Sequence, residues 1–165
     1  NHKKGLPSGI SLKINNITNY PLVDKLYEAS QAGVKIKMIV RGICCLIPGV
    51  KGLSENITVV SVVDKFLEHP RVYIFENSGE KKIYLSSADL MTRNIENRVE
   101  VACPVYDKEL QEQILDTFNI SCKDNTKGRI VNQNPQNKML APQVSEKDQR
   151  SQWATYSYYQ NKLIE

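Results

Sequence analysis

The sequence is poor in the residues that usually build metal centres and disulfide frameworks. It has four cysteines and two histidines, and no two cysteines have the C-x-x-C spacing of a zinc or redox motif. Cys44 and Cys45 are neighbours, which disfavours a bridge between them, and Cys103 and Cys122 lie far apart in the chain. We therefore expect no metal site within this sequence, and reduced, mostly buried thiols in a cytosolic protein.

Long apolar runs and a strong charge of either sign are also lacking. No stretch approaches the roughly 20 apolar residues of a membrane-spanning helix, and no signal peptide opens the chain. The formal net charge of +4 is too small to indicate nucleic acid as a partner. Residues 1–60 carry eight Lys and Arg against three Asp and Glu. This mild basic bias suits an anionic partner, although on charge alone a solvated basic face is the simpler explanation.

What is present suffices for one domain with a proper core. The 165 residues are 41% hydrophobic, and we expect residues 1–165 to form a single domain. The chain begins without methionine, and residues 1–5 resemble the end of a helix. We expect a piece of a longer protein.

The first part of the sequence predicts a βαβ unit. Residues 10–14 alternate apolar and polar side chains as a strand does, and residues 36–40 form an apolar run typical of a buried strand. Between them, Pro21 and Gly33 mark the start and the end of an amphipathic helix. The right-handed crossover of such a unit makes the two strands parallel.

The later residues predict a mixed α/β sheet flanked by helices. We expect strands at residues 58–63, 72–75, 82–85 and 99–103, with a hairpin turn at Asn77-Ser78-Gly79. Asp107 caps a helix, and its expected inner face is Leu110, Ile114, Leu115 and Phe118.

The last quarter predicts an arm and a terminal helix. Residues 123–145 are polar and lack periodicity, so we expect an irregular arm. The helix at residues 146–165 is expected to begin after Ser145, with Asp148 three positions on. Its aromatic stripe is expected to dock on the core, and consists of Trp153, Tyr156, Tyr159 and Leu163.

Residues 39–71 contain the strongest candidate site. Arg41 ends the apolar strand and precedes a glycine-rich loop, and loops at the carboxyl ends of parallel strands form ligand crevices. His69 follows 28 residues later, with Arg71 two positions on, so an extended backbone points both side chains to one side. Arginine suits phosphate oxygens, and histidine moves protons near neutral pH. The stretch predicts a site for phosphate chemistry.

A third cluster follows the strand at residues 82–85. Ser87 and Asp89 come first and Arg93 soon after, and we expect Asp89 to orient His69. Taken separately, each cluster has a simpler explanation: a charge at a strand end, a surface histidine, or a helix cap.

Several motifs occur together and in order. They are Val40-Arg41-Gly42-Ile43-Cys44-Cys45, Pro48-Gly49-Val50, Phe66-Leu67-Glu68-His69, Ser87-Ala88-Asp89, Arg93-Asn94, Arg98-Val99-Glu100-Val101 and Arg150-Ser151-Gln152. The combination resembles the carboxyl-terminal region of bacterial polyphosphate kinase over most of the chain. The resemblance implies a phospholipase D-like fold, the second of two such domains that each give one histidine to a shared site.

The resemblance also implies roles for the site residues. Arg41 and His69 would contact ATP phosphates, with Arg71 as a weaker candidate and Ser87, Asp89 and Arg93 in support. The preceding domain, absent from this sequence, would supply the phosphorylated histidine and most of the Mg²⁺ ligands. The implied reaction is reversible transfer of the γ-phosphate of ATP to polyphosphate, with ADP as product. A homo-oligomer in the cytoplasm, peripheral to the inner membrane, is implied as well.

Some residues depart from the expected motifs and leave alternatives open. The phospholipase D signature H-x-K-x4-D reads His69-Pro70-Arg71 here, with Glu76 at the carboxylate position. Three substitutions bear on polyphosphate affinity, at Ile47, Leu90 and Thr92. The alternatives are a phospholipase D-type phosphodiesterase with His69 as nucleophile or acid, and a phosphate-binding module without catalysis. The Arg41 loop and the incomplete signature argue against the phosphodiesterase.

Overall fold

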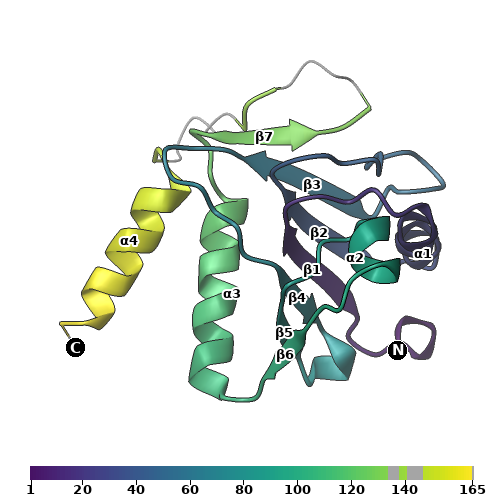
Figure 1. The fold of residues 1–165 in the computed structure, drawn as a ribbon, viewed down its shortest axis with the longest axis horizontal. Helices are drawn as coiled ribbons and strands as arrows, with labels where there is room; N and C mark the ends of the chain where they lie inside the picture. The colour runs from purple at the N-terminus through teal and green to yellow at the C-terminus, as the bar shows by residue number, and fades with distance from the viewer. Residues whose placement is uncertain (134–137, 141–146, 165) are drawn as a thin grey trace.

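The computed structural model describes residues 1–133, 138–140 and 147–164, which form a mixed seven-stranded sheet with helices on both faces (Figure 1). The strand order is β6-β5-β4-β1-β2-β3-β7. The strands are β1 Gly9–Ile14, β2 Lys35–Val40, β3 Ile57–Val62, β4 Val72–Phe75, β5 Lys82–Ser86, β6 Ala102–Val105 and β7 Gly128–Val131. The helices are α1 Tyr20–Gln31, α2 Thr92–Glu96, α3 Lys108–Cys122 and α4 Ser151–Lys162. The predicted fold class is confirmed.

The predicted βαβ unit forms the centre of the sheet. β1 and β2 pair in parallel, and α1 packs Val23 and Leu26 against the core. Asn19 caps α1, because its side-chain oxygen accepts a hydrogen bond from the backbone N–H of Leu22 at 3.1 Å. The unit therefore delivers the ends of β1 and β2 side by side.

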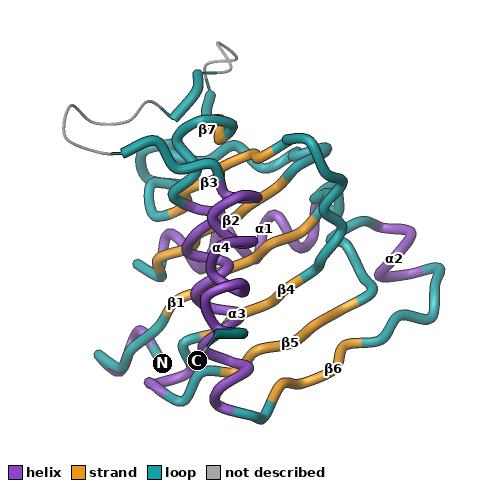
Figure 2. The backbone as a smooth tube through the Cα atoms, turned by 90° about the vertical axis from the view of Figure 1, so that its left-hand side faces the viewer, coloured by secondary structure: helices purple, strands orange, loops and turns teal. Residues whose placement is uncertain are grey.

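Strand directions bring many chain segments to one edge of the sheet, here called the carboxyl edge because β1 and β2 end there. β3 is parallel to β2, and β4 is antiparallel to β1 and to its hairpin partner β5. The carboxyl edge therefore collects the ends of β1, β2, β3 and β5 and the starts of β4, β6 and β7. In Figure 2 this edge lies to the right of the strands, where α2 is.

Three predictions about the later residues need correction. The strand expected at residues 99–103 is β6, Ala102–Val105, and Val99 is fully exposed. On α3, Leu110 is exposed, and Gln111 is buried instead because its amide donates to the carbonyl oxygen of Val105 at 2.7 Å. The four cysteines are free, but Cys103 is exposed on the edge strand, so the thiols are less buried than expected.

The arm and the terminal helix also differ from expectation. The arm contains a strand, β7, which pairs antiparallel with β3. α4 begins at Ser151, and the expected cap Ser145 lies outside the described residues. The aromatic stripe is exposed: Trp153 is 44% accessible and Tyr156 62%. α4 contacts α3, and Tyr158 donates a hydrogen bond to Asp116 there at 2.8 Å. Across the described helices, none is long and apolar enough to cross a membrane.

A buried carboxylate joins α3, β7 and α4. Asp124 is fully buried, and its Oδ1 accepts hydrogen bonds from the backbone N–H groups of Thr126, Lys127 and Gly128, while its Oδ2 accepts one from Ser151. These contacts fix where α4 starts, since the carboxylate satisfies backbone donors at the beginning of the helix.

Acid is expected to weaken this junction. Burial acts to raise the pKa of Asp124, but hydrogen bonds from Ser151, Lys127 and Thr126 outweigh it and lower the pKa. The unfolded chain thus takes the proton more readily, so the stabilisation is complete above about pH 4 and lost as pH falls through the lower native pKa. Asp124→Asn is expected to lower the free energy of unfolding near neutral pH by about 2 kcal/mol and to flatten the acid loss. Urea titrations across this pH range measure both effects, and parental stability of the variant would contradict the assignment.

Candidate functional site

The carboxyl edge brings together four of the predicted site residues. Arg41 follows β2, His69 and Arg71 precede β4, and Asp89 follows β5. Although the four are spread over nearly 50 positions in the sequence, a chain of short polar contacts connects them.

Arg41 is placed by the end of β1. Its Nε donates to Oδ1 of Asn15 at 2.6 Å. The next residues are tied to the same strand end, because Gly42 N–H donates to the carbonyl oxygen of Asn15 at 2.8 Å and Ile43 N–H to Oδ1 of Asn16 at 2.9 Å. A Cβ added at Gly42 would lie 2.5 Å from Oδ1 of Asn16. Only glycine permits this close approach.

His69 lies between two arginines. Nη2 of Arg41 is 2.7 Å from Nδ1, and Nη2 of Arg71 is 2.9 Å from Nε2. A guanidinium only donates hydrogen bonds, and a neutral imidazole accepts at one nitrogen only. In either tautomer, one of the two contacts therefore places two donors face to face. An anionic oxygen bound between ring and guanidinium would accept from both, so the arrangement favours an anion.

Asp89 fixes Arg71. Asp89 is 2% exposed, and Oδ1 accepts hydrogen bonds from the backbone N–H of Asn15 at 2.8 Å and from its side chain at 3.2 Å. Arg71 forms an ion pair with it, Nε to Oδ1 at 3.3 Å. Burial acts to raise the pKa of Asp89, but the hydrogen bonds from Asn15 and Arg71 outweigh it and lower the pKa. Asp89 is therefore a carboxylate at neutral pH.

The expected direct contact between Asp89 and His69 is not found. Arg71 lies between them, since its Nη2 reaches both Nε2 of His69 and, at 3.3 Å, Oδ2 of Asp89. A histidine that precedes an arginine by two residues on extended backbone shares its side, and the arginine's longer side chain reaches the carboxylate first.

The two arginines differ in charge balance. The charge of Arg71 is compensated by Asp89, whereas the described part of the chain contains no carboxylate within ion-pair distance of Arg41. The described partners of Arg41 are the neutral amide of Asn15 and the ring of His69. Of the two arginines, Arg41 is thus the one whose positive charge is available to an anion.

The other two supporting candidates are not part of this contact chain. The hydroxyl of Ser87 is hydrogen-bonded to the carboxylate of Glu100, and Ser87 is exposed. Arg93 is exposed on α2, and none of its side-chain atoms makes a hydrogen bond or ion pair with the described residues.

Two contact residues were missed in the sequence. Asn15 and Asn16 carry the contacts of Arg41, Gly42 and Asp89. The available signal was their position, directly after an alternating strand, where polar side chains face a ligand crevice.

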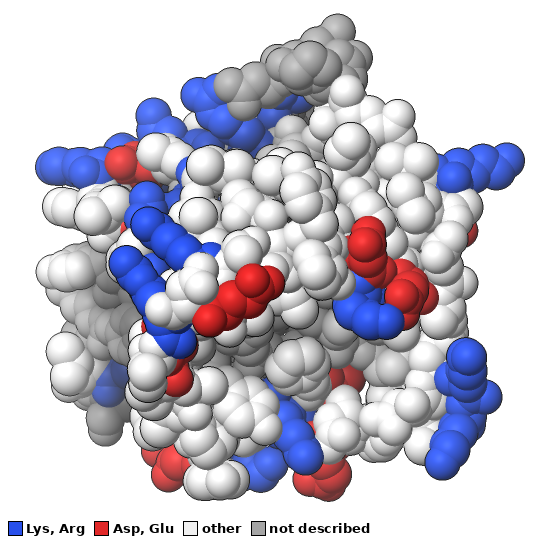
Figure 3. All heavy atoms as spheres, turned by 45° about the vertical axis from the view of Figure 1, so that its right-hand side comes forward, with Lys and Arg blue, Asp and Glu red and all other residues white. Residues whose placement is uncertain are grey.

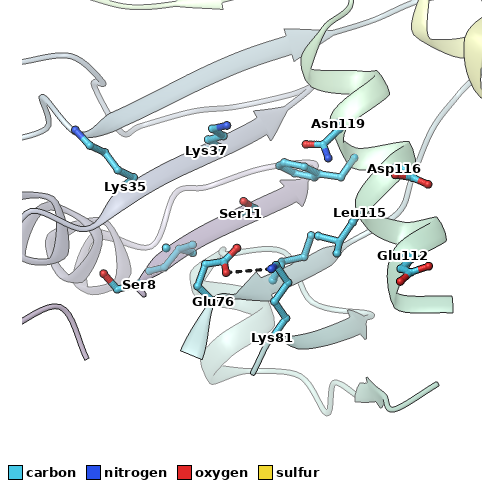
Figure 4. Close-up of a pocket in the computed structure, with 14 residues that line it drawn as sticks. Ser8, Ser11, Lys35, Lys37, Glu76, Lys81, Glu112, Leu115, Asp116 and Asn119 are labelled. Carbon is cyan, nitrogen blue, oxygen red and sulfur yellow. Dashed lines mark ion pairs between the residues drawn. The ribbon is translucent and has the colours of Figure 1, made fainter. Parts of the chain in front are cut away.

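Glu76 does not complete a phospholipase D-type signature with His69. It follows the end of β4, whereas Arg71 precedes its start, so the two lie at opposite edges of the sheet. There Glu76 pairs with Lys81 at 3.2 Å in a groove of about 500 Å³ between the sheet and α3 (Figure 4). Lys35 and Lys37 line this groove together with the carboxylates of Glu112 and Asp116. Its charge is mixed, and it adds nothing to the His69 site.

The arginines of the whole chain gather at the carboxyl edge. Four lie beside or between strands there, Arg129 is the second residue of β7, and Arg150 pairs with Asp64 after β3. The set is Arg41, Arg71, Arg93, Arg98, Arg129 and Arg150. On the face drawn in Figure 3, basic and acidic side chains are interspersed. Because the arginine fork matches phosphate oxygens, this edge suits an anion with several phosphates.

The fold has counterparts among solved structures. Nuc from Salmonella typhimurium, a phospholipase D family member, superposes with a TM-score of 0.57 at 16% identity, covering 75% of this chain and 82% of that one. NucT from Helicobacter pylori gives 0.54 at 15% identity, over 72% and 80%. At such identities the likeness concerns the fold alone. Fold and site together define a domain with a phospholipase D-like fold and an arginine–histidine cluster at its carboxyl edge.

Sequence comparison identifies the family. The family model described as polyphosphate kinase C-terminal domain 2 matches residues 1–152. The polyphosphate kinase of Escherichia coli K12 is 49% identical over 158 residues, and that of Vibrio parahaemolyticus 48% over 161 residues, covering 96% and 98% of this chain. The crystal structure of polyphosphate kinase from Porphyromonas gingivalis superposes with a TM-score of 0.93 at 41% identity, over 97% of this chain and 24% of that one.

The chain belongs to the polyphosphate kinase family and corresponds to its second C-terminal domain. The resemblance seen in the sequence motifs is confirmed. The chain spans 23% of the length of these two curated relatives, which are enzymes.

Proposed function

We propose that this domain supplies one half of a polyphosphate kinase site, binding the phosphates of ATP and protonating the leaving group. The observation that carries the proposal is the position of His69 between Arg41 and Arg71. At one of its two ring nitrogens, an N–H of the imidazole faces an N–H of a guanidinium. A phosphate oxygen relieves this conflict. ATP, ADP and polyphosphate are the proposed ligands, and the gathered arginines suit all three.

The proposed chemistry divides between this chain and the rest of a longer kinase. A histidine elsewhere attacks the γ-phosphorus, a nitrogen–phosphorus bond forms, and the bond from phosphorus to the β-phosphate oxygen breaks. His69 donates a proton to that oxygen as ADP leaves and takes it back in the reverse direction. Arg41 neutralises the charge that develops on the transferred group, where most of the catalysis of such transfers lies.

The residues at this edge do not fit Mg²⁺. That ion prefers oxygen ligands in an octahedral arrangement. Asp89 already pairs with Arg71 and accepts from Asn15, and its neighbours are cationic. Among the described residues, no group of three or more His, Cys, Asp or Glu side chains is placed to hold a metal ion. We therefore assign the metal to the rest of the kinase and to the nucleotide.

A ligand bound at this edge also needs protein on its other side. His69 is exposed on this chain, whereas ligand sites usually bury most of the ligand surface. We propose that the rest of the longer kinase closes over this edge. A homo-oligomer, a cytoplasmic location and peripheral contact with the inner membrane remain proposals that follow from the family.

This domain alone is expected to form no phosphohistidine. It holds His69 and His2 only, and His69 is assigned to proton transfer. Incubation with γ-labelled ATP and Mg²⁺, followed by an alkaline quench, should leave the chain unlabelled. The full-length kinase should become labelled under the same conditions. Stable labelling of the isolated chain would contradict the proposal and favour His69 as a nucleophile of phospholipase D type.

A further inference from the structure

The segment that carries His69 has little support of its own. Residues 63–71 connect β3 to β4 without helix or strand, and His69 is exposed. In the described structure, no backbone–backbone hydrogen bond ties residues 64–70 to another segment. The position of the ring therefore depends on side-chain contacts.

The start of α4, together with the residue that precedes it, Arg150, supplies most of these contacts. The side-chain amide of Gln152 donates to the carbonyl oxygen of Phe66 at 2.7 Å and accepts from the N–H of Phe66 at 2.9 Å, as a neighbouring strand would. Arg150 donates two hydrogen bonds to the carboxylate of Asp64, from Nε to Oδ2 at 2.7 Å and from Nη2 to Oδ1 at 2.6 Å. This hydrogen-bonded guanidinium lowers the pKa of Asp64, so the pair is charged at neutral pH.

Gln152 also reaches the residue next to His69. Its amide nitrogen donates to Oε1 of Glu68 at 3.0 Å, while Lys13 of β1 holds Oε2 at 2.5 Å. Lys13 is two residues before Asn15, the partner of Arg41. Glu68 is thus fixed from α4 and from the strand whose end places Arg41, and the ring of His69 follows directly.

We propose that Gln152 is a positioning residue for His69 in phosphoryl transfer. This inference rests on the proposed function. Through three hydrogen bonds to Phe66 and Glu68, the amide holds the segment so that the imidazole lies between Arg41 and Arg71. Gln152 does not touch the reacting atoms, so its effect passes through His69.

The test uses the full-length kinase with Gln152→Met, which keeps the length of the side chain and removes its hydrogen bonds. Because a misplacement of about 1 Å costs up to about 100-fold, kcat for polyphosphate synthesis should fall about 10- to 100-fold. The matched control is Gln160→Met, an exposed glutamine on the same helix, which should change kcat by less than about twofold. Parental kcat in Gln152→Met would overturn the inference.

The same substitution made in a His69→Ala enzyme distinguishes an effect on the position of His69 from a general loss of stability. In His69→Ala, adding Gln152→Met should lower the residual kcat by less than about twofold, because the group it positions is gone. An equal loss in both backgrounds would indicate a merely structural role and overturn the inference. If His69→Ala alone keeps full activity, the proposed function fails instead, and the two failures are distinguishable.

Gln152→Glu provides an independent readout if the methionine variant does not fold. The carboxylate still accepts from Phe66 N–H but loses both donated bonds and faces Glu68. Protonation restores a donor, so kcat relative to the parent should rise as pH is lowered. A ratio that does not change with pH would overturn the inference.

Discussion

Replacing His69 by alanine in the full-length kinase is expected to lower the rate of phosphoryl transfer from ATP by about 10²–10⁴-fold, the usual contribution of a general acid. The leaving ADP oxygen loses its proton donor, and Arg41 and Arg71 lose the ring between them. The direct measurement is a rapid-quench single turnover with γ-labelled ATP, which follows label into protein and polyphosphate.

The chain contains its own control for this result. His2 is the other histidine, exposed and bonded to Ser8 at 3.0 Å, far from the carboxyl edge. His2→Ala is expected to keep the parental rate. A His69→Ala enzyme that transfers label at the parental rate would remove His69 from the mechanism.

Replacing Arg41 by alanine should lower kcat by about 10²–10³-fold, as the loss of one preorganised donor to a transition-state oxygen does. Arg41 has no carboxylate partner among the described residues, so its charge is available to the phosphate and its loss is not offset. Arg41→Lys keeps the charge but not the fork, and we expect it to recover only part of the activity. Steady-state rates of polyphosphate synthesis at saturating ATP measure kcat for both variants.

Lys37→Ala is the matched control for Arg41. Lys37 is an exposed cation on the same strand, near the opposite edge of the sheet. Its loss changes net charge equally but touches only the mixed groove, so kcat should be unchanged. Equal losses in both variants would indicate a general electrostatic effect rather than a contact with phosphate.

The sequence was informative wherever local signals agreed with the fold. Pro21, Gly33 and the apolar spacing between them define α1, and the apolar run before Arg41 defines β2 as a buried strand. Arg41 and Asp89 follow strands that end at the carboxyl edge, as the rule for ligand crevices predicts. His69 and Arg71 reach the same edge because they precede β4, an antiparallel strand that starts there.

Other features depend on contacts distant in sequence. β7 has a glycine and an exposed arginine and no alternation, and it exists because it pairs with β3 beside the buried Asp124. Asn15 and Asn16 belong to no motif in the sequence, and their role depends on the close approach of Gly42 in the fold. Gln152 is hydrogen-bonded to Phe66, in the segment that carries His69, across 86 positions of sequence, and no local pattern reveals this contact.

The central claim is that a phosphate of ATP binds between Arg41 and His69. A crystal structure of the full-length kinase with a non-hydrolysable ATP analogue tests it most directly. We predict a β- or γ-phosphate oxygen within about 3 Å of both Nη2 of Arg41 and a ring nitrogen of His69. An analogue bound elsewhere, with Arg41 and His69 still in contact with each other, would contradict the account.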